Sequence, residues 1–131
     1  NQEGIDSRGD DERTPLMMAA ENEHFQVVKY LIEQGEADPN IADSYGFNAL
    51  HLAAINNRTN TELIEFLSTN MSLTSINKKG RWGYTPLDWA YYNGRSLRQE
   101  IIALIRSKGG KANKYDTNGR HVGRFYGDLN H

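Results

Sequence analysis

The heptapeptide TPLMMAA at residues 14–20 indicates the fold, because related heptapeptides recur twice further along the chain. NALHLAA occupies residues 48–54 and TPLDWAY occupies residues 85–91, so the copies begin 34 and 37 residues apart. Each copy is followed by a second apolar segment, at residues 27–32, 63–67 and 101–105. An asparagine then follows each segment, namely Asn40, Asn77 and Asn113. Recurrence at this period predicts a stack of similar supersecondary units that bury their apolar faces against one another.

The residues of each copy favour a helix. Thr14 and Thr85 can each cap a helix with the side-chain oxygen, and the proline that follows each suits the first helical position. Leu16, Ala19 and Ala20 have the i, i+3, i+4 spacing of one helix face. We therefore expect inner helices near residues 15–23, 49–57 and 86–94, and outer helices near residues 25–34, 61–70 and 97–108.

Turn residues separate these helices. Gly35 and Gly109 follow the outer helices, where a left-handed residue would close the last turn. Asp43, Gly46 and residues 116–119 have the composition of tight turns between repeats.

The whole pattern resembles the ankyrin-repeat family, whose repeats run roughly D-x-x-G-x-T-P-L-H-x-A-A, then G-H-x-x-V-V-x-L-L, then G-A-D-V-N. The resemblance extends from residue 5 to about residue 120. It implies an all-α solenoid of helix–loop–helix units joined by hairpin-like fingers. We expect one domain over residues 1–131, with repeats near 10–42, 43–79 and 80–115 and a partial finger and tail at 116–131.

The chain departs from the family pattern at a few places. Glu36 is an inserted residue, and extra residues lie around 57–61, 71–73 and 94–100, where loops and helix ends tolerate them. Residues after about 120 lack apolar periodicity, so we expect them to be mobile or to dock against the third repeat. The expected anchors for docking are Val122, Phe125 and Tyr126.

Composition excludes several classes of protein. There is no cysteine, which removes disulfides, thiolate metal sites and thiol nucleophiles. No apolar run has the length of a membrane span, and no secretory signal opens the sequence. We expect an intracellular protein, cytoplasmic or nuclear, that does not bind membranes.

The histidines do not indicate a catalytic or metal-binding site. His51 matches the histidine of the family's T-P-L-H, a ring that hydrogen-bonds within its own repeat and toward the next, although Asn48 replaces the usual threonine. His24 matches the family's G-H histidine, and His121 with His131 fits no standard metal spacing. No nucleophile–histidine–acid set and no glycine-rich phosphate loop is present. We expect no catalytic residue, no metal and no cofactor.

The resemblance also implies where a partner binds, namely at the finger tips and the exposed positions of the inner helices. These positions hold tyrosine, tryptophan and arginine, which are enriched at binding hot spots. We predict a monomeric, non-catalytic protein–protein interaction module, a scaffold or the recognition arm of a longer protein. The predicted partner-binding residues are Tyr45, Phe47, Ile55, Arg81, Trp82, Tyr84 and Tyr92. Trp89 and Tyr91 fall at positions that face the core.

Two alternatives remain open at this point. Trp82, Tyr84 and Tyr92 with Asp88 could form an aromatic cage for a methylated lysine of a peptide. Charge is also unevenly distributed, with a net charge of −8 over residues 1–43 and +6 over the rest. The basic C-terminal half could bind nucleic acid, but no recognition motif supports this, so no nucleic-acid partner is expected.

Overall fold

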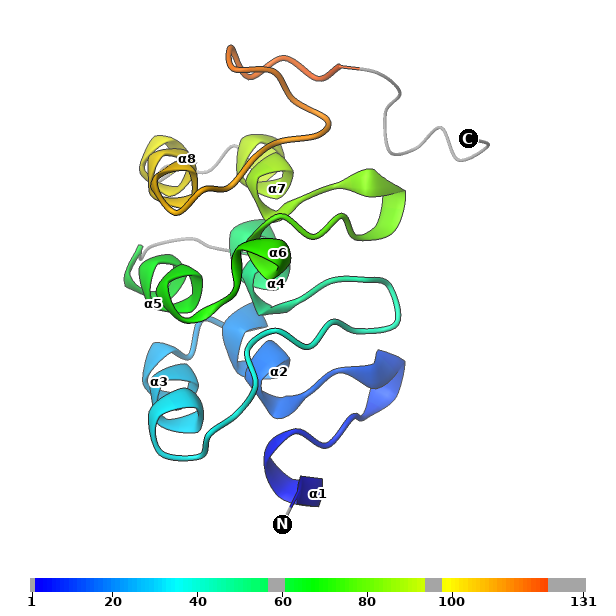
Figure 1. Cartoon of the computed structure of the whole chain (residues 1–131), viewed down its shortest axis with the longest axis vertical. Helices are drawn as coiled ribbons and strands as arrows, with labels where there is room; N and C mark the ends of the chain where they lie inside the picture. Colours follow the sequence, from blue (N-terminus) through cyan, green and yellow to red (C-terminus); the bar gives the residue numbers. More distant parts are fainter. Residues whose placement is uncertain (1, 57–60, 94–97, 123–131) are drawn as a thin grey trace.

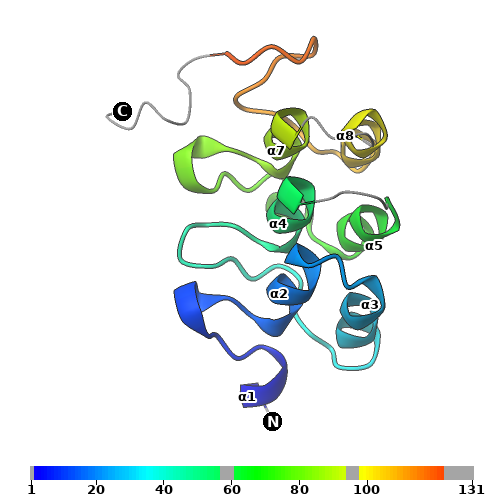
Figure 2. The same cartoon turned by 180° about the vertical axis from the view of Figure 1, so that it is seen from behind.

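Three helix pairs stacked along one axis make up the structure (Figure 1). The computed structural model describes residues 2–56, 61–93 and 98–122. The pairs are α2 (Pro15–Glu21) with α3 (Phe25–Glu33), α4 (Ala49–Asn56) with α5 (Glu62–Asn70), and α7 (Pro86–Asn93) with α8 (Arg98–Ser107). The inner helices α2, α4 and α7 pack on one another, and the outer helices form a second column beside them (Figures 1 and 2). The predicted all-α solenoid is confirmed, with every predicted helix close to its expected limits.

Two short helices were not expected from the sequence. Helix α1 (Gln2–Ile5) precedes the first repeat, and α6 (Leu73–Ile76) follows α5. The sequence indicates extra residues around 71–73 but not their conformation. Ser72 explains it, because its hydroxyl accepts a hydrogen bond from the backbone N–H of Ser75 at 3.1 Å and so caps α6. Of the insertions expected around residues 57–61 and 94–100, residues 57–60 and 94–97 lie outside the described residues.

The predicted helix caps are present. Thr14 Oγ1 accepts a hydrogen bond from the N–H of Met17 at 3.3 Å. Thr85 and Asp88 form a reciprocal capping box, in which Thr85 Oγ1 accepts from the Asp88 N–H at 3.2 Å and Asp88 Oδ2 accepts from the Thr85 N–H at 2.8 Å. In the second repeat Asn48 Oδ1 takes the capping role by accepting from the N–H of Leu50 and of His51.

The expectation for Gly35 is wrong. Gly109 has the left-handed φ of +91° that closes α8, but after α3 the residue with positive φ is Glu36, at +58°. The inserted residue has therefore taken the left-handed position. Glycine is still needed at residue 35, since a Cβ there would lie 2.6 Å from Cδ1 of Ile5 and 2.9 Å from the carbonyl oxygen of Leu31.

Repeated asparagines join successive repeats. Asn40 Oδ1 accepts a hydrogen bond from the N–H of Ser72, 32 residues further on, at 2.9 Å. Asn77 makes the corresponding contacts one repeat later, accepting from the Lys111 N–H at 2.7 Å and donating to the carbonyl of Gly109 at 3.1 Å. Asn40 and Asn77 thus fix the distance between neighbouring loops.

Position in the stack decides which apolar residues are exposed. Met18, Leu52 and Trp89 occupy the same place in successive repeats, yet Met18 is 55% exposed whereas Leu52 and Trp89 are 2% and 6% exposed. The later helices are covered by the repeat before them, and no described helix pair precedes α2. Exposure of Val27 and Tyr30 at this end has the same cause.

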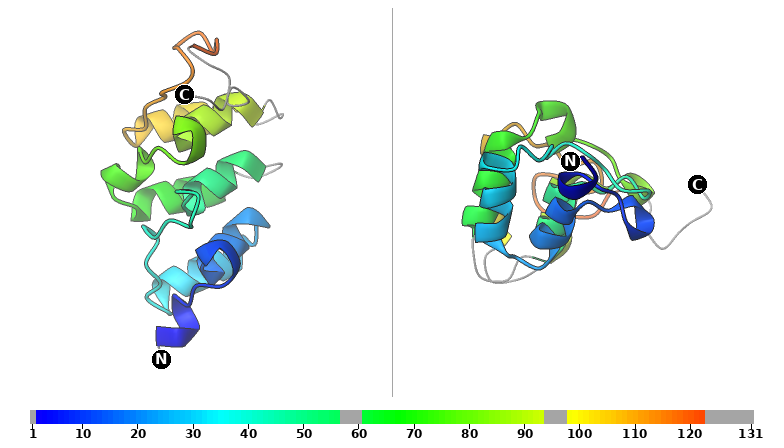
Figure 3. Two further views of the ribbon diagram at one scale, coloured as in Figure 1. Left: turned by 90° about the vertical axis from the view of Figure 1, so that its right-hand side faces the viewer. Right: turned by 90° about the horizontal axis from the view of Figure 1, so that it is seen from below.

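Three fingers project from one side of the helix pairs (Figure 3), and a fourth lies over the C-terminal end of the stack, where Thr117 comes near Leu87 and Arg106. We call them finger 1 (residues 9–13), finger 2 (43–47), finger 3 (80–84) and finger 4 (116–120). In each finger the backbone N–H of the first residue donates to the carbonyl of the last residue, at 2.8 to 2.9 Å. Fingers 1 and 2 are joined directly, because the Ser44 N–H donates to the carbonyl of Asp11 at 2.9 Å. Gly46 of finger 2 also lies against Gly80 of finger 3, so fingers 1 to 3 form a continuous edge along the solenoid.

Finger 4 covers the inner end of the third repeat. The ring of Tyr115 stacks on Tyr91 with 5.4 Å between centroids, and His121 Nε2 lies 2.8 Å from the hydroxyl of Tyr84. Of the anchors expected for the tail, Val122 is 41% exposed, so this expectation is wrong for it, while Phe125 and Tyr126 lie outside the described residues. His121 is the anchor that the apolar pattern did not indicate.

Substituting His121 should therefore weaken the end of the stack. We expect His121→Ala to lower the free energy of unfolding by about 1 kcal/mol, because it removes one partly buried hydrogen bond. Val122→Ala is the matched control and should change it by less than about 0.5 kcal/mol, the usual range for exposed positions. Urea unfolding of both variants measures the difference, and equal effects would contradict docking through His121.

Candidate functional site

The predicted surface residues meet at the tips of fingers 2 and 3. The guanidinium carbon of Arg81 lies 5.1 Å from the ring centroid of Tyr45 and 4.5 Å from that of Trp82. Both distances are within the range of cation–π attraction. Tyr45 is 41% exposed, Arg81 is exposed and Trp82 is half-buried. One cation thus joins aromatic side chains from two neighbouring fingers.

The backbone of each finger sets this arrangement. Asp43 is buried, and its Oδ1 accepts hydrogen bonds from the N–H of Tyr45 and of Phe47, both at 2.9 Å. In finger 3 Trp82 has φ of +65°, which is rare for a bulky residue, followed by Gly83 at +82°. Holding tryptophan in this conformation costs energy, of the order of 1–3 kcal/mol for such residues. The fold therefore maintains the Trp82 ring next to Arg81 at some cost.

Two of the predicted residues belong to the packing of the fingers. Tyr84 is 1% exposed, so its predicted place on the surface is wrong. Its ring packs on Trp89 at 4.7 Å between centroids, and its hydroxyl reaches His121. Phe47 is half-buried and lies against Gly80, where a Cβ would come within 2.6 Å of its ring. Phe47 fills the space between fingers 2 and 3.

The other two predicted partner-binding residues, Tyr92 and Ile55, lie on the inner helices. Tyr92 is 49% exposed on α7, with its ring edge-on to Trp89 at 5.3 Å between centroids. Ile55 is half-buried on α4, and its carbonyl accepts a hydrogen bond from the side chain of Asn93 at 3.1 Å. Trp89 and Tyr91 are buried, as the sequence predicts. The exposed part of the candidate surface is therefore formed by Tyr45, Arg81 and Tyr92, with Trp82 half covered.

The aromatic cage is not supported by this geometry. Asp88 is 0% exposed, and its carboxylate accepts hydrogen bonds from four of its own chain's groups rather than facing solvent. The donors are the N–H groups of Thr85, Asn113 and Lys114 and the hydroxyl of Thr85, at 2.7 to 3.1 Å. Since Tyr84 is buried as well, these side chains do not line an open cage.

His51 has the structural role that the resemblance implies. Its Nδ1 accepts a hydrogen bond from the Asn48 N–H at 3.1 Å. Its Nε2 lies 2.9 Å from the carbonyl oxygen of Lys78 and 3.1 Å from that of Tyr84, so the proton is on Nε2. Burial lowers the pKa of His51 from 6.5 to about 4. The ring therefore joins the second repeat to finger 3 in its neutral form.

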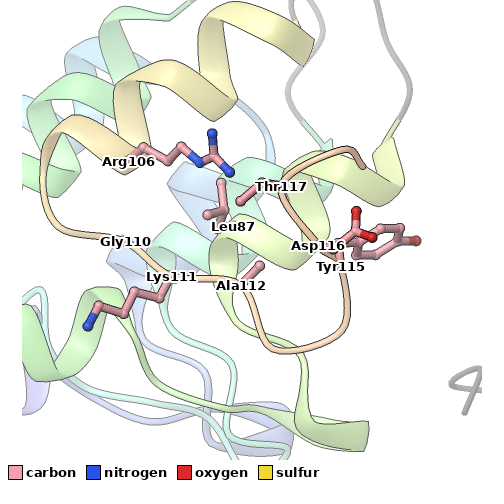
Figure 4. A pocket seen from close by; sticks show the side chains of 8 residues that line it. All are labelled: Leu87, Arg106, Gly110, Lys111, Ala112, Tyr115, Asp116 and Thr117. Atoms are coloured by element: carbon pink, nitrogen blue, oxygen red, sulfur yellow. The ribbon is translucent and has the colours of Figure 1, made fainter. Parts of the chain in front are cut away.

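A cleft of about 420 Å³ opens at the C-terminal end of the stack, between α8 and residues 110–117 (Figure 4). Leu87 lines its floor and the guanidinium of Arg106 reaches over it toward Thr117. Arg106 occupies the place that buried Ser68 has in the second repeat. A charged side chain at this position suits the end of a stack better than a contact with a further apolar helix.

The described residues form neither a metal site nor a membrane-spanning helix. Within residues 2–56, 61–93 and 98–122, no group of three or more histidine, aspartate or glutamate side chains is placed to hold a metal ion. None of the described helices is long and apolar enough to cross a bilayer. Lys78 and Lys79 directly precede finger 3 and are exposed. They were not among the predicted partner-binding residues, although their closeness to Arg81 in the sequence could have indicated a basic cluster.

Known proteins match this chain over most of its length. A family model for ankyrin repeats, in three copies, matches residues 1–78 and 37–118. A palmitoyltransferase AKR1 from Lachancea kluyveri is 35% identical over 99 residues, which is 72% of this chain and 13% of that protein. Putative ankyrin repeat proteins of Rickettsia felis and Rickettsia bellii are 34% and 36% identical, over 82% and 70% of this chain and 26% and 38% of their own lengths.

The chain thus spans between 13% and 38% of the length of these relatives. What it shares with them is the repeat region, and the similarity to a palmitoyltransferase reaches only a small part of that protein. Ankyrin repeats generally mediate binding between proteins. The family model, the relatives and the stacked helix pairs with their fingers agree: this chain belongs to the ankyrin-repeat family.

Proposed function

We propose that this chain is a non-catalytic protein-interaction module that binds its partner at the tips of fingers 2 and 3. The observation that carries the proposal is the stack of Tyr45, Arg81 and Trp82, which joins two fingers at an exposed edge. Tyrosine, tryptophan and arginine are the residue types that most often dominate binding energies. The partner is a protein or peptide, and Tyr92 extends the surface along α7.

Two features support a role in binding rather than in stability. Tyr45 is 41% exposed, and the Arg81 side chain is exposed, so neither adds much to the buried core. The rings are also positioned before any partner arrives, because Asp43 fixes finger 2 and the turn at Trp82 and Gly83 fixes finger 3. A preformed surface loses less conformational entropy when it binds.

Affinity purification from extracts of the cells that express the protein tests the proposal. We expect the double variant Tyr45→Ala, Arg81→Ala to retain less than about a tenth of the partner, a loss of roughly 2 kcal/mol on the hot-spot scale. Its melting temperature should stay within a few degrees of wild type, since both side chains are exposed.

The control carries Val27→Ala and Tyr30→Ala, which truncate two side chains at another exposed site, one of them again a tyrosine. These residues lie on α3, away from the fingers, so this variant should capture the partner as wild type does (Figure 1). Equal capture by both double variants would overturn the proposal. Trp82 is left intact in this test because its half-buried ring contributes to packing as well.

A further inference from the structure

We infer that finger 3 and the residues leading into it select an acidic peptide segment. This inference rests on the proposed function and adds the chemistry of the partner to it. Lys78, Lys79 and Arg81 lie within four residues of one another, and all three are exposed. The same stretch, residues 78–84, contains no acidic residue.

These cations form no ion pair with an acidic side chain among the residues that the structure describes. In the part of the chain that the structure describes, no carboxylate lies within ion-pair distance of Lys78, Lys79 or Arg81. The described ion pairs that involve finger residues instead belong to Arg8 with Glu12 and to Arg13 with Glu21 and Asp43. Finger 3 therefore presents an uncompensated positive charge beside the exposed ring of Tyr45.

The acidic groups near finger 3 are occupied by their own chain. Asp43 Oδ1 accepts two backbone N–H groups of finger 2, and its Oδ2 lies 3.4 Å from Nε of Arg13. Asp116 Oδ1 accepts the N–H groups of Asn118 and Arg120 at 2.9 and 3.0 Å. Asp88 is buried and accepts backbone N–H groups as well. These carboxylates keep their charge, but their oxygens are directed at the turns that they organise, and none forms an ion pair with Lys78, Lys79 or Arg81 in the described residues.

A neighbouring cation extends this charge toward finger 4. A Cβ on Gly83 would lie 3.3 Å from Cε of Lys114, so the Lys114 side chain runs along finger 3. The side chain of Asn113 fixes this approach by donating to the carbonyl of Gly83 at 2.9 Å. An acidic segment lying across finger 3 would meet Lys114 as well as Lys78, Lys79 and Arg81, while its apolar side chains could contact Tyr45.

Finger 1 argues against nucleic acid at the same edge. Asp10, Asp11 and Glu12 are exposed on finger 1, and fingers 1 and 2 are joined through the Asp11–Ser44 hydrogen bond. A nucleic acid carries phosphates at every residue, so a strand running along the fingers would meet this negative charge. A peptide can instead be acidic where it contacts finger 3 and neutral or basic where it approaches finger 1.

The test uses a display library of random 12-residue peptides, selected against the wild-type chain. Peptides enriched on wild type should contain several aspartates or glutamates with at least one aromatic or leucine residue. Fluorescence anisotropy then measures the affinity of the most enriched peptide. We expect the variant Lys78→Glu, Lys79→Glu to bind it at least tenfold more weakly, and a rise from 50 to 300 mM salt to weaken wild-type binding about tenfold.

The matched control is Lys29→Glu, Lys108→Glu, which changes the net charge equally at sites on the outer side of the stack and should leave the affinity unchanged. Replacing the acids of the peptide by asparagine and glutamine should abolish binding. Equal binding of that neutral peptide would overturn the inference while leaving the fingers as the binding surface. If a 12-nucleotide single strand bound more tightly than the enriched peptide at both salt concentrations, the inference would be overturned in favour of nucleic acid. Enrichment of peptides without acidic residues would overturn it too.

Discussion

Asp88→Ala should lower the free energy of unfolding by about 4 kcal/mol, the largest effect that we expect from one substitution in this protein. The carboxylate accepts hydrogen bonds from the N–H groups of Thr85, Asn113 and Lys114, and it is fully buried. Alanine would leave these donors without an acceptor, and each unsatisfied buried donor costs roughly 1–3 kcal/mol. Urea unfolding at neutral pH measures the loss.

Asp88→His is the informative control, because His51 occupies the same place one repeat earlier. The two sites have opposite hydrogen-bond polarity. His51 donates from Nε2 to carbonyl oxygens of Lys78 and Tyr84, whereas Asp88 accepts from N–H groups of the loop that follows α8. A histidine at residue 88 would meet donors, so we expect it to restore little of the stability. Full restoration would show that this assignment of donors and acceptors is wrong.

Stability should fall by about 3 kcal/mol between pH 7 and pH 4 through His51 alone. Burial lowers the pKa of this histidine from 6.5 to about 4 in the folded chain. As the pH falls through about 6.5, the unfolded chain takes up a proton that the folded chain does not bind. The unfolded state is favoured progressively until the folded protein also titrates near pH 4, and the stabilisation is fully present above pH 6.5.

A His51→Gln variant separates this contribution from that of the carboxylates, which titrate in both proteins. The variant should be less stable than wild type at pH 7, because the contacts to finger 3 are lost. The difference between the two proteins should narrow as the pH is lowered from 7 to 4. Parallel stability profiles, measured by urea unfolding at steps of pH, would contradict a neutral buried His51.

The repeat pattern predicts the helices well because each is specified locally. Thr14 and Thr85 mark the starts of α2 and α7, and the spacing of Leu16, Ala19 and Ala20 defines a buried face. What local sequence does not specify is the response to an insertion. Glu36 took the left-handed position expected of Gly35, and the residues around 71–73 became α6.

In the candidate site too, the sequence predicts some features and misses others. Matching positions to the family indicates which residues lie in the fingers and on the exposed face of the inner helices, and Tyr45, Arg81 and Tyr92 are exposed at those positions. The matching does not predict the burial of Tyr84, because its partner His121 directly follows finger 4, 37 residues further along the chain. Nor does it predict that Arg81 lies between two rings, which depends on the distance between neighbouring fingers.

Site-specific photo-cross-linking shows whether the partner binds at fingers 2 and 3. A photoreactive phenylalanine is placed at residue 45 on finger 2, at residue 92 on α7, or at residue 30 on α3, and the protein is irradiated in an extract of the cells that express it. All three positions hold exposed tyrosines, so each variant should fold. If fingers 2 and 3 carry the partner, residues 45 and 92 should cross-link to the same protein and residue 30 should not. Cross-linking of that protein from residue 30 alone would contradict binding at the fingers.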